Sequence, residues 1–363
     1  MKRFPRSWFR RMFLLLLLPL AVAAQEDYQV TKVVENLHDP WTMVELPDGR
    51  WIVTEMSGSL VFVGKDGQLN RQQLDLPQLY VAGQGGLLDI ALTQDYSMSH
   101  RVLFSFAQGN ADNNRLAVAT ARLEEDQLKD IKLILAVEPM KGTPVHFGGR
   151  LAVLNDGTWL VTVGDGFDYR EQAQLRHSQL GKILRFREDG RAPVDNPFPD
   201  APYVYSYGHR NPQGLVVDEE NGHIIEHEHG PDGGDEINII EAGENYGWPV
   251  ITQGLDYSGA KISPFTQYAD MRQPVVDWTP SIAPSGMALY TNVLFSALRD
   301  QLLVSTLKNQ AVYAVNLSAT PPVTTRIFAT IKQRLRDVAV GQDGAVYILT
   351  NGHKAALLKV QPK

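Results

Sequence analysis

The stretches Pro47-Asp48-Gly49-Arg50-Trp51-Ile52-Val53-Thr54 and Asn155-Asp156-Gly157-Thr158-Trp159-Leu160-Val161-Thr162 share one pattern. In both, an Asp-Gly turn precedes a run of large apolar residues that ends in threonine, which is typical of a strand entered through a tight turn. Four more segments have this loose form: Ser97 to Phe106, Asn221 to Ile225, Asp300 to Ser305, and Asp343 to Thr350. Their spacing of roughly 45 to 80 residues fits blades of about four strands joined by variable loops.

Six such segments, and no long segment with a helical period, predict an all-β protein with the fold of a six-bladed β-propeller. A single sandwich or barrel of 363 residues would exceed the size at which one core usually divides into domains. A propeller avoids this limit because each blade packs only on its neighbours. Two β domains side by side are the alternative, but no Pro/Ser-rich linker or break in composition separates two halves.

The composition excludes several classes of protein. A content of 44% hydrophobic and 21% charged residues is ordinary for a globular protein and too apolar for a disordered one. The net charge of −7 argues against nucleic acid as a partner, because binding phosphates needs an excess of Lys and Arg. The chain has no cysteine, which excludes disulfides, thiolate catalysis and cysteine-based zinc sites.

Residues 1–24 have the features of a secretory signal peptide. Five basic residues precede an apolar run from Met12 to Val22, and small residues at Ala21 to Ala24 provide a cleavage site. The run is too short to span a bilayer comfortably, so we expect no stable membrane insertion after cleavage. Arg10-Arg11 leaves both the Sec and the Tat route open. We expect a periplasmic protein with a single propeller domain, residues 25–363, and a net charge of −12.

Glycine-rich loops carry the first candidate site residues. Gln84 lies in Gly83-Gln84-Gly85-Gly86, where the glycines allow the backbone to approach a flat ligand closely, although a plain turn explains the same pattern. His146 and Asp165 each lie in a glycine-flanked loop beside one blade strand. A carboxylate beside a histidine fixes its tautomer and raises its basicity, which suits a general base. An unrelated surface histidine and turn aspartate are the alternative.

Two further motifs combine polar side chains with Gly and Pro. Arg210-Asn211 joins a forked cation to an amide, which suits a developing oxyanion or a planar quinone as well as a contact between blades. The stretch from His229 to Glu236 combines carboxylates, glycines and a proline, and these oxygen ligands favour calcium. His227 and His229 alternate as zinc ligands could, but no third nitrogen ligand is near in sequence.

Three basic residues form the last candidate group. Arg334 and Arg336 point to the same face if that segment is extended, and Lys308 follows a predicted strand of the preceding blade. Two guanidinium groups so close repel each other unless water screens them or an anion lies between them, and a polycarboxylate ligand satisfies that need. A solvated surface is the alternative.

Taken together, the motifs resemble those of the soluble pyrroloquinoline-quinone (PQQ)-dependent sugar dehydrogenases, and most closely the shorter periplasmic aldose sugar dehydrogenases. The shared motifs, in chain order, are Gly-Gln-Gly-Gly-Leu-Leu-Asp, His-Phe-Gly-Gly-Arg, Gly-His-Arg-Asn-Pro-Gln-Gly, Gly-Pro-x-x-x-Asp-Glu-Ile-Asn, Asn-Tyr-Gly-Trp-Pro and Arg-x-Arg-Asp. The resemblance runs from about Val30 to Lys359 and implies a six-bladed propeller that oxidises aldoses to lactones with PQQ and Ca²⁺.

The resemblance also implies a role for each motif residue. His146 would remove the proton of the anomeric hydroxyl while a hydride passes to C5 of the quinone, and Asp165 would hold His146. Arg210 would stabilise charge on the C5 oxygen. The further cofactor contacts would be Gln84, Asn211, Lys308, Arg334 and Arg336. Gly230 and Pro231 would bind the catalytic calcium through their carbonyls, whereas Glu236 and the carbonyl of Tyr246 would bind a structural one.

Ser281 stands near the place of a cofactor-binding threonine of the glucose enzyme, and no residue is assigned to stack on the sugar. Two other functions stay open: a calcium-dependent propeller lactonase, which leaves Lys308, Arg334 and Arg336 unused, and a secreted propeller that only binds a ligand. Neither the physiological sugar nor the external electron acceptor follows from the sequence.

Overall fold

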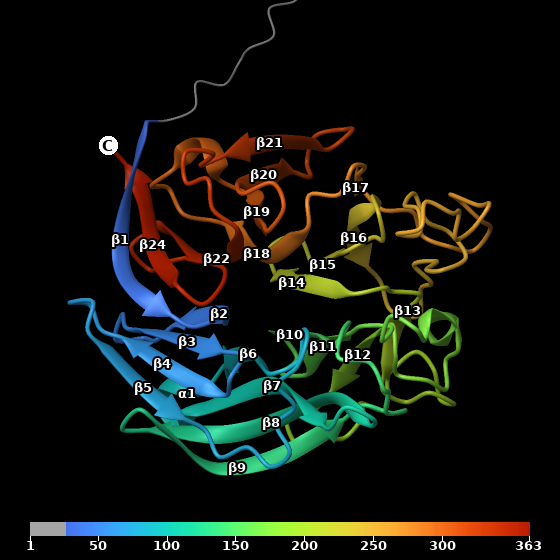
Figure 1. The fold of residues 1–363 in the computed structure, drawn as a ribbon, viewed down its shortest axis with the longest axis horizontal. Helices are drawn as coiled ribbons and strands as arrows, with labels where there is room; N and C mark the ends of the chain where they lie inside the picture. The colour runs from blue at the N-terminus through green and yellow to red at the C-terminus, as the bar shows by residue number, and fades with distance from the viewer. Residues whose placement is uncertain (1–26) are drawn as a thin grey trace, which may run out of the picture.

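The computed structural model describes residues 27–363, so the predicted signal peptide lies outside the described residues. Six four-stranded antiparallel sheets surround a central axis (Figure 1), which confirms the predicted six-bladed β-propeller. Among residues 27–363, no helix has the length and apolar character needed to cross a membrane.

Each blade begins with its strand nearest the axis. In chain order the first three blades are β2 (Pro40–Glu45), β3 (Trp51–Glu55), β4 (Ser59–Val63), β5 (Leu69–Gln73); β6 (Leu87–Leu92), β7 (Arg101–Gly109), β8 (Asn114–Glu124), β9 (Gln127–Ala136); and β10 (Gly148–Val153), β11 (Trp159–Val163), β12 (Lys182–Phe186), β13 (Val204–Tyr207). The next two are β14 (Pro212–Asp218), β15 (His223–Glu228), β16 (Asp235–Ile240), β17 (Val276–Trp278); and β18 (Pro284–Tyr290), β19 (Gln301–Thr306), β20 (Val312–Asn316), β21 (Val323–Ile327). The last blade is β22 (Leu335–Val340), β23 (Val346–Thr350), β24 (Ala355–Pro362) and β1 (Tyr28–Leu37), and the helical turns are α1 (Tyr96–Ser99), η1 (Arg170–Gln174) and η2 (Ser296–Leu298).

The six sequence segments that predicted the blades each contain all or part of the second strand of one blade: β3, β7, β11, β15, β19 and β23. The Asp-Gly turns before β3 and β11 are closed by the aspartate side chains. Asp48 Oδ1 accepts the backbone N–H of Arg50 at 3.0 Å, and Asp156 Oδ1 accepts that of Thr158 at 2.9 Å. The turn before β23 is closed in the same way, by Asp343 Oδ1 and the backbone N–H of Ala345 at 3.0 Å, so three of the six segments share this Asx turn.

The ring is closed by a strand that the sequence pattern did not reveal. β1 comes first in the described chain, yet it forms the outer strand of the last blade (Figure 1). It pairs with β24 from Tyr28 opposite Pro362 to Leu37 opposite Ala355. The two ends of the domain are thereby held together by one antiparallel ladder.

The hydrophobic core is divided among the interfaces between blades. In the described part of the chain, six clusters of buried apolar residues each join consecutive blades, and one of them joins the last blade to the first. Trp159 is 1% exposed and belongs to the cluster between the second and third blades. No single core has to grow with chain length, which agrees with the reason for predicting a propeller.

Every inner strand has a register shift near its first residues. The shifts fall between Pro40 and Met43, Leu87 and Ile90, Gly148 and Leu151, Pro212 and Gly214, Pro284 and Met287, and Leu335 and Asp337. A β-bulge re-aims side chains and is common beside active sites. The bulges lie at the end of each inner strand that adjoins the loops carrying the candidate residues.

Arg150, within the bulge of β10, has a contact with an inner strand of each of the other five blades. Its guanidinium donates to Thr42 Oγ1 at 3.0 Å, Gln213 O at 3.0 Å and Ser285 O at 3.4 Å. It also lies 3.6 Å from Asp89 and 3.5 Å from Asp337, both buried. One cation therefore neutralises two buried carboxylates and joins six blades at the axis.

We predict that Arg150→Met destabilises the propeller by about 3–5 kcal/mol, because it leaves two buried carboxylates without a counter-charge. Chemical denaturation measures the change in the free energy of unfolding. Arg122→Met is the control, because its ion pairs with Glu124 and Asp130 lie at the surface and are worth at most about 1 kcal/mol. Equal effects of the two substitutions would contradict the role given to Arg150.

Candidate active site

His146 and Asp165 come from adjoining strand ends and form a hydrogen-bonded pair. His146 lies just before β10 and Asp165 just after β11, and these strands pair antiparallel with Gly148 opposite Val163. His146 Nδ1 is 2.7 Å from Asp165 Oδ1, and both side chains are buried. The structure thus brings together the two residues that the sequence proposed as base and partner.

Two further N–H groups hold Asp165 as an acceptor. The backbone N–H of Phe167 donates to Oδ1 and Trp248 Nε1–H donates to Oδ2, each at 2.7 Å. Since Asp165 accepts these bonds as a carboxylate, His146 carries its proton on Nδ1 and keeps the lone pair of Nε2 free to act as a base. The motif around Trp248 stood out in the sequence, but this contact across 83 residues did not.

Burial lowers the pKa of His146 from its ordinary value, since the charged form loses its hydration. The hydrogen bond and charge of Asp165 oppose this shift, whereas the positive charges of Arg210 and Lys141 add to it. Lys141 is itself buried, which lowers its pKa to about 7, and its Nζ donates to Asn114 Oδ1 at 2.9 Å. The imidazole is therefore kept in its neutral, basic form.

Gln84 holds the loop of the base and faces a cavity. Its Oε1 accepts the backbone N–H of His146 at 2.8 Å, where His146 has a φ of 54°. The cavity has a volume of about 110 Å³, and Gln84, Asn211 and Arg336 are among its lining residues. Three of the predicted cofactor contacts, from three blades, therefore share one cavity.

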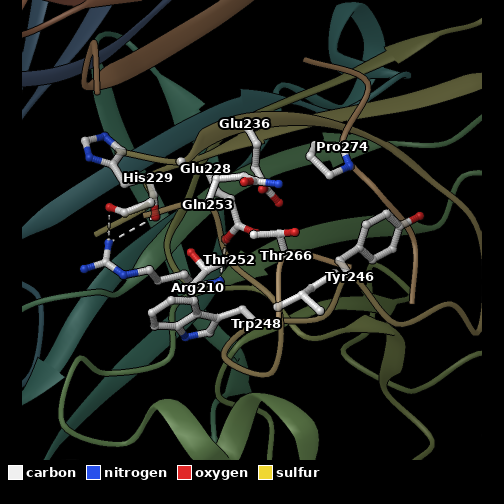
Figure 2. A pocket seen from close by; sticks show the side chains of 13 residues that line it. Arg210, Glu228, His229, Glu236, Tyr246, Trp248, Thr252, Gln253, Thr266 and Pro274 are labelled. Atoms are coloured by element: carbon white, nitrogen blue, oxygen red, sulfur yellow. Dashed lines mark hydrogen bonds between the residues drawn. The ribbon is translucent and has the colours of Figure 1, made fainter. Parts of the chain in front are cut away.

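A buried glutamate holds the backbone of Arg210 and Asn211. Glu228 Oε2 accepts the backbone N–H groups of both residues, the one from Asn211 at 3.0 Å. Arg210 Nη1 donates to His229 O at 3.0 Å and to Gly230 O at 2.7 Å (Figure 2). The Gly230 carbonyl, predicted as a calcium ligand, thus already accepts a hydrogen bond from a guanidinium.

The three predicted anion-binding cations differ in exposure. Arg336 is half-buried, and its Nε donates to Asn351 Oδ1 at 3.0 Å. Lys308 and Arg334 are exposed and do not line the cavity that Arg336 lines. Burial, then the charge of Arg150, lowers the pKa of Arg336 to about 10, and Arg334 adds to the effect. Among residues 27–363, none of the three forms an ion pair, although the charges of Asp337 and Asp39 partly offset the effect of the two arginines on Arg336.

A second cavity, of about 20 Å³, adjoins Arg210 and is acidic (Figure 2). Glu228, Glu236 and Tyr246 are among the residues that line it. Gly230 lines it too, and the next residue, Pro231, is buried. Burial raises the pKa of the carboxyl groups of Glu226, Glu228 and Glu236. The negative charge of Glu228 adds to this shift for Glu226 and Glu236, and that of Asp165 adds to it for Glu228.

This donor set fits a calcium ion, because buried carboxylates need a cation and hard cations prefer oxygen. Glu226 Oε1 and Asn238 Oδ1 are buried and have no hydrogen-bond partner within residues 27–363. His209, Glu226 and Glu228 place their ligand atoms within 4.8 Å of one another. For this acidic group, the sequence analysis had named Glu236 and Tyr246. It did not find Glu226, Glu228 or Asn238, because the pairing of neighbouring strands brings these residues to Glu236.

The other residues considered from the sequence lie elsewhere or have other partners. His229 Nε2 donates to Pro284 O at 2.5 Å, and both ring nitrogens of His227 are buried without a partner in the described chain, so no zinc site appears among these residues. Ser281 donates to Asp235 Oδ2 at 2.6 Å. Trp278 is 9% exposed on β17 and packs in a core cluster.

Comparisons with known proteins agree with this fold and identify relatives of the chain. Aldose sugar dehydrogenase YliI of Escherichia coli (strain K12) is 35% identical over 352 residues, which cover 94% of this chain and 95% of that protein. The crystal structure of the soluble aldose sugar dehydrogenase from Escherichia coli in the apo-form has a TM-score of 0.88 at 34% identity, covering 93% and 100% of the chains. The PQQ-bound form of aldose sugar dehydrogenase from Streptomyces coelicolor has a TM-score of 0.74 at 28% identity, covering 93% and 99%.

These relatives, together with the six-bladed propeller, identify the protein as an oxidoreductase. The family model for glucose/sorbosone dehydrogenases matches residues 37–359. The chain belongs to this family, and its members' chemistry is the oxidation of sugars.

We predict that the imidazole of His146 titrates below the ordinary histidine value of about 6.5. Nitrogen-15 NMR of the imidazole signals against pH measures it, with His146→Gln used to assign the signal. Asp165→Asn should lower the midpoint further, because it removes the charge that favours the imidazolium ion. A midpoint at or above 6.5 in the unsubstituted protein would contradict this electrostatic account.

Proposed function

We propose that this protein oxidises aldose sugars to lactones with PQQ as cofactor. The observation that carries the proposal is the His146–Asp165 pair beside a cavity that Gln84, Asn211 and Arg336 line. A lactonase needs a base as well, but it has no use for the unpaired cations Arg336, Arg334 and Lys308. An oxidoreductase with an anionic, planar cofactor uses both the base and these cations.

The residues fit PQQ, a planar quinone with several carboxylates. Gln84 and Asn211 offer amide groups to its polar edge, while Arg336, Arg334 and Lys308 offer positive charge to its carboxylates. When bound, PQQ supplies the acceptor for the electron pair that leaves the sugar. The PQQ-bound relative from Streptomyces coelicolor supports this assignment.

His146 takes the proton of the anomeric hydroxyl at Nε2, the nitrogen that Asp165 leaves free. Asp165 stabilises the resulting imidazolium ion, and the bonds from Trp248 and Phe167 keep its carboxylate in place. Arg210 is 4% exposed and points its guanidinium towards the His229–Gly230 backbone, where it stabilises negative charge that develops on a bound ligand.

We also propose two calcium sites. Glu236 and the carbonyl of Tyr246 bind a structural ion, and the unpartnered oxygens of Glu226 and Asn238 beside them support this choice. Gly230 and Pro231 bind a catalytic ion, for which the support is the resemblance of the Gly-Pro motif. The Gly230 carbonyl has a second lone pair besides the one that Arg210 uses.

Export to the periplasm is a further proposal. The basic segment, apolar run and small residues of positions 1–24 support cleavage near Ala23 or Ala24, which leaves residues 25–363 as one propeller domain. The periplasm is also a compartment in which an acceptor outside the protein can reoxidise the cofactor.

We predict that the purified protein reduces an artificial electron acceptor with an aldose only after PQQ and Ca²⁺ are added. His146→Ala should lower kcat/KM about 10²- to 10⁴-fold, because it removes the general base. His223→Ala, at an exposed histidine, is the control and should leave the rate unchanged. Oxidation without PQQ, or full activity of His146→Ala, would contradict the proposal.

We predict that chelation of calcium lowers the melting temperature, because an ion that binds only the folded state stabilises it by about 2.7 kcal/mol at a hundredfold excess over Kd. Differential scanning calorimetry with calcium and with EGTA measures the difference. Glu236→Gln should reduce this difference, whereas Glu220→Gln, at an exposed carboxylate, should not. The structural site is refuted if calcium has no effect on the melting temperature.

A further inference from the structure

Two exposed aromatic rings lie over the base. The ring of Phe167 meets that of His146 edge-on, with centroids 5.1 Å apart and an angle of 83°. Tyr257 stacks on Phe167 with centroids 6.4 Å apart and an angle of 20°. Phe167 is 42% and Tyr257 65% exposed, which is unusual for large apolar side chains grouped beside a buried site.

Neither fold stability nor burial explains a phenylalanine at position 167. Its φ of 68° lies in the left-handed region, where a bulky side chain is strained and where Gly or Asn is the usual choice. The bond from its N–H to Asp165 Oδ1 needs only the backbone, which any residue except proline supplies. Strained residues of this kind cluster at ligand sites, so the exposed ring itself is the feature that a ligand would use.

Tyr257 is held in place from two sides. It lies between Leu255 and Lys261, which bridge each other, and Leu255 also bridges Asp232. Its hydroxyl accepts a bond from Arg210 Nη2 at 3.4 Å. The ring is therefore anchored both to the loop that carries Gly230 and to the arginine of the active site.

We infer that Phe167 and Tyr257 bind the apolar face of an aldopyranose ring and position its anomeric hydroxyl at His146. A pyranose presents C–H groups on its faces and hydroxyls around its edge, so its faces pack on aromatic rings. Neither aromatic residue lines the cavity that holds Gln84, Asn211 and Arg336, which leaves that cavity to the cofactor and the aromatic rim to the substrate. This inference rests on the proposed function and extends it to the substrate-binding residues.

The test measures sugar and cofactor binding separately in Phe167→Ala. We expect KM for an aldose to rise about three- to tenfold, the value of one aromatic contact, with the PQQ dissociation constant changed less than twofold. Phe167→Trp should restore KM. Phe265→Ala is the matched control, because Phe265 is 45% exposed and pairs with another exposed tyrosine, Tyr268, edge-on and without a ring contact to His146. Should Phe167→Ala fail to fold, Phe167→Asn replaces it, since Asn tolerates positive φ.

A second measurement needs no turnover. Saturation-transfer NMR on the PQQ-loaded His146→Gln variant should show transfer from aromatic protein protons to the sugar C–H protons, and the further change Phe167→Ala should abolish it. A higher PQQ dissociation constant with an unchanged KM, or no change in either, would overturn the inference. If no aldose is oxidised but Phe167-dependent transfer persists, the sugar surface stands and the proposed function fails. If neither aldose oxidation nor Phe167-dependent transfer is observed, both the sugar surface and the proposed function are refuted.

Discussion

The salt-bridged guanidinium of Arg150 is the constraint on which the rest of the structure depends. A ring of six blades has no central hydrophobic core, so the inner strands need another means of keeping a common register. Arg150 provides it through Asp89 and Asp337 and through hydrogen bonds to three further inner strands. The six bulges make this possible, because each turns a polar residue towards the axis.

The active site follows from this arrangement. Most candidate residues lie in loops at the end of the propeller where inner strands begin and second strands finish, while Arg336 and Glu236 lie at the starts of β22 and β16. Fixing the inner strands therefore fixes the loops. His146 precedes the first residue of β10 by two positions, and only three residues separate it from Arg150. Asp165, held by Trp248 from the next blade, then completes the base. Rigid strands thereby give a buried histidine its tautomer and a lowered pKa.

Sequence patterns were sufficient for the features that depend on local residues. The Asp-Gly turns marked the second strands, and the flanking glycines marked the loops of His146 and Asp165. Contacts that join distant residues were not visible in this way. Trp248, the strand pairing of β1 and the rings of Phe167 and Tyr257 all depend on how blades meet in space. The hydrogen bond between Arg210 and the Gly230 carbonyl was likewise not foreseen, because each motif had been interpreted alone.

A single-turnover experiment tests the central claim, that His146 and a bound quinone together remove a proton and a hydride from C1 of an aldose. The PQQ- and calcium-loaded protein is mixed without oxygen with an aldose carrying hydrogen or deuterium at C1, and the quinone absorbance is followed. The account predicts bleaching that deuterium slows several-fold, and none on this timescale in a His146→Gln variant that still binds PQQ. Unchanged absorbance in the unsubstituted protein, or equally fast bleaching in the variant, would contradict it.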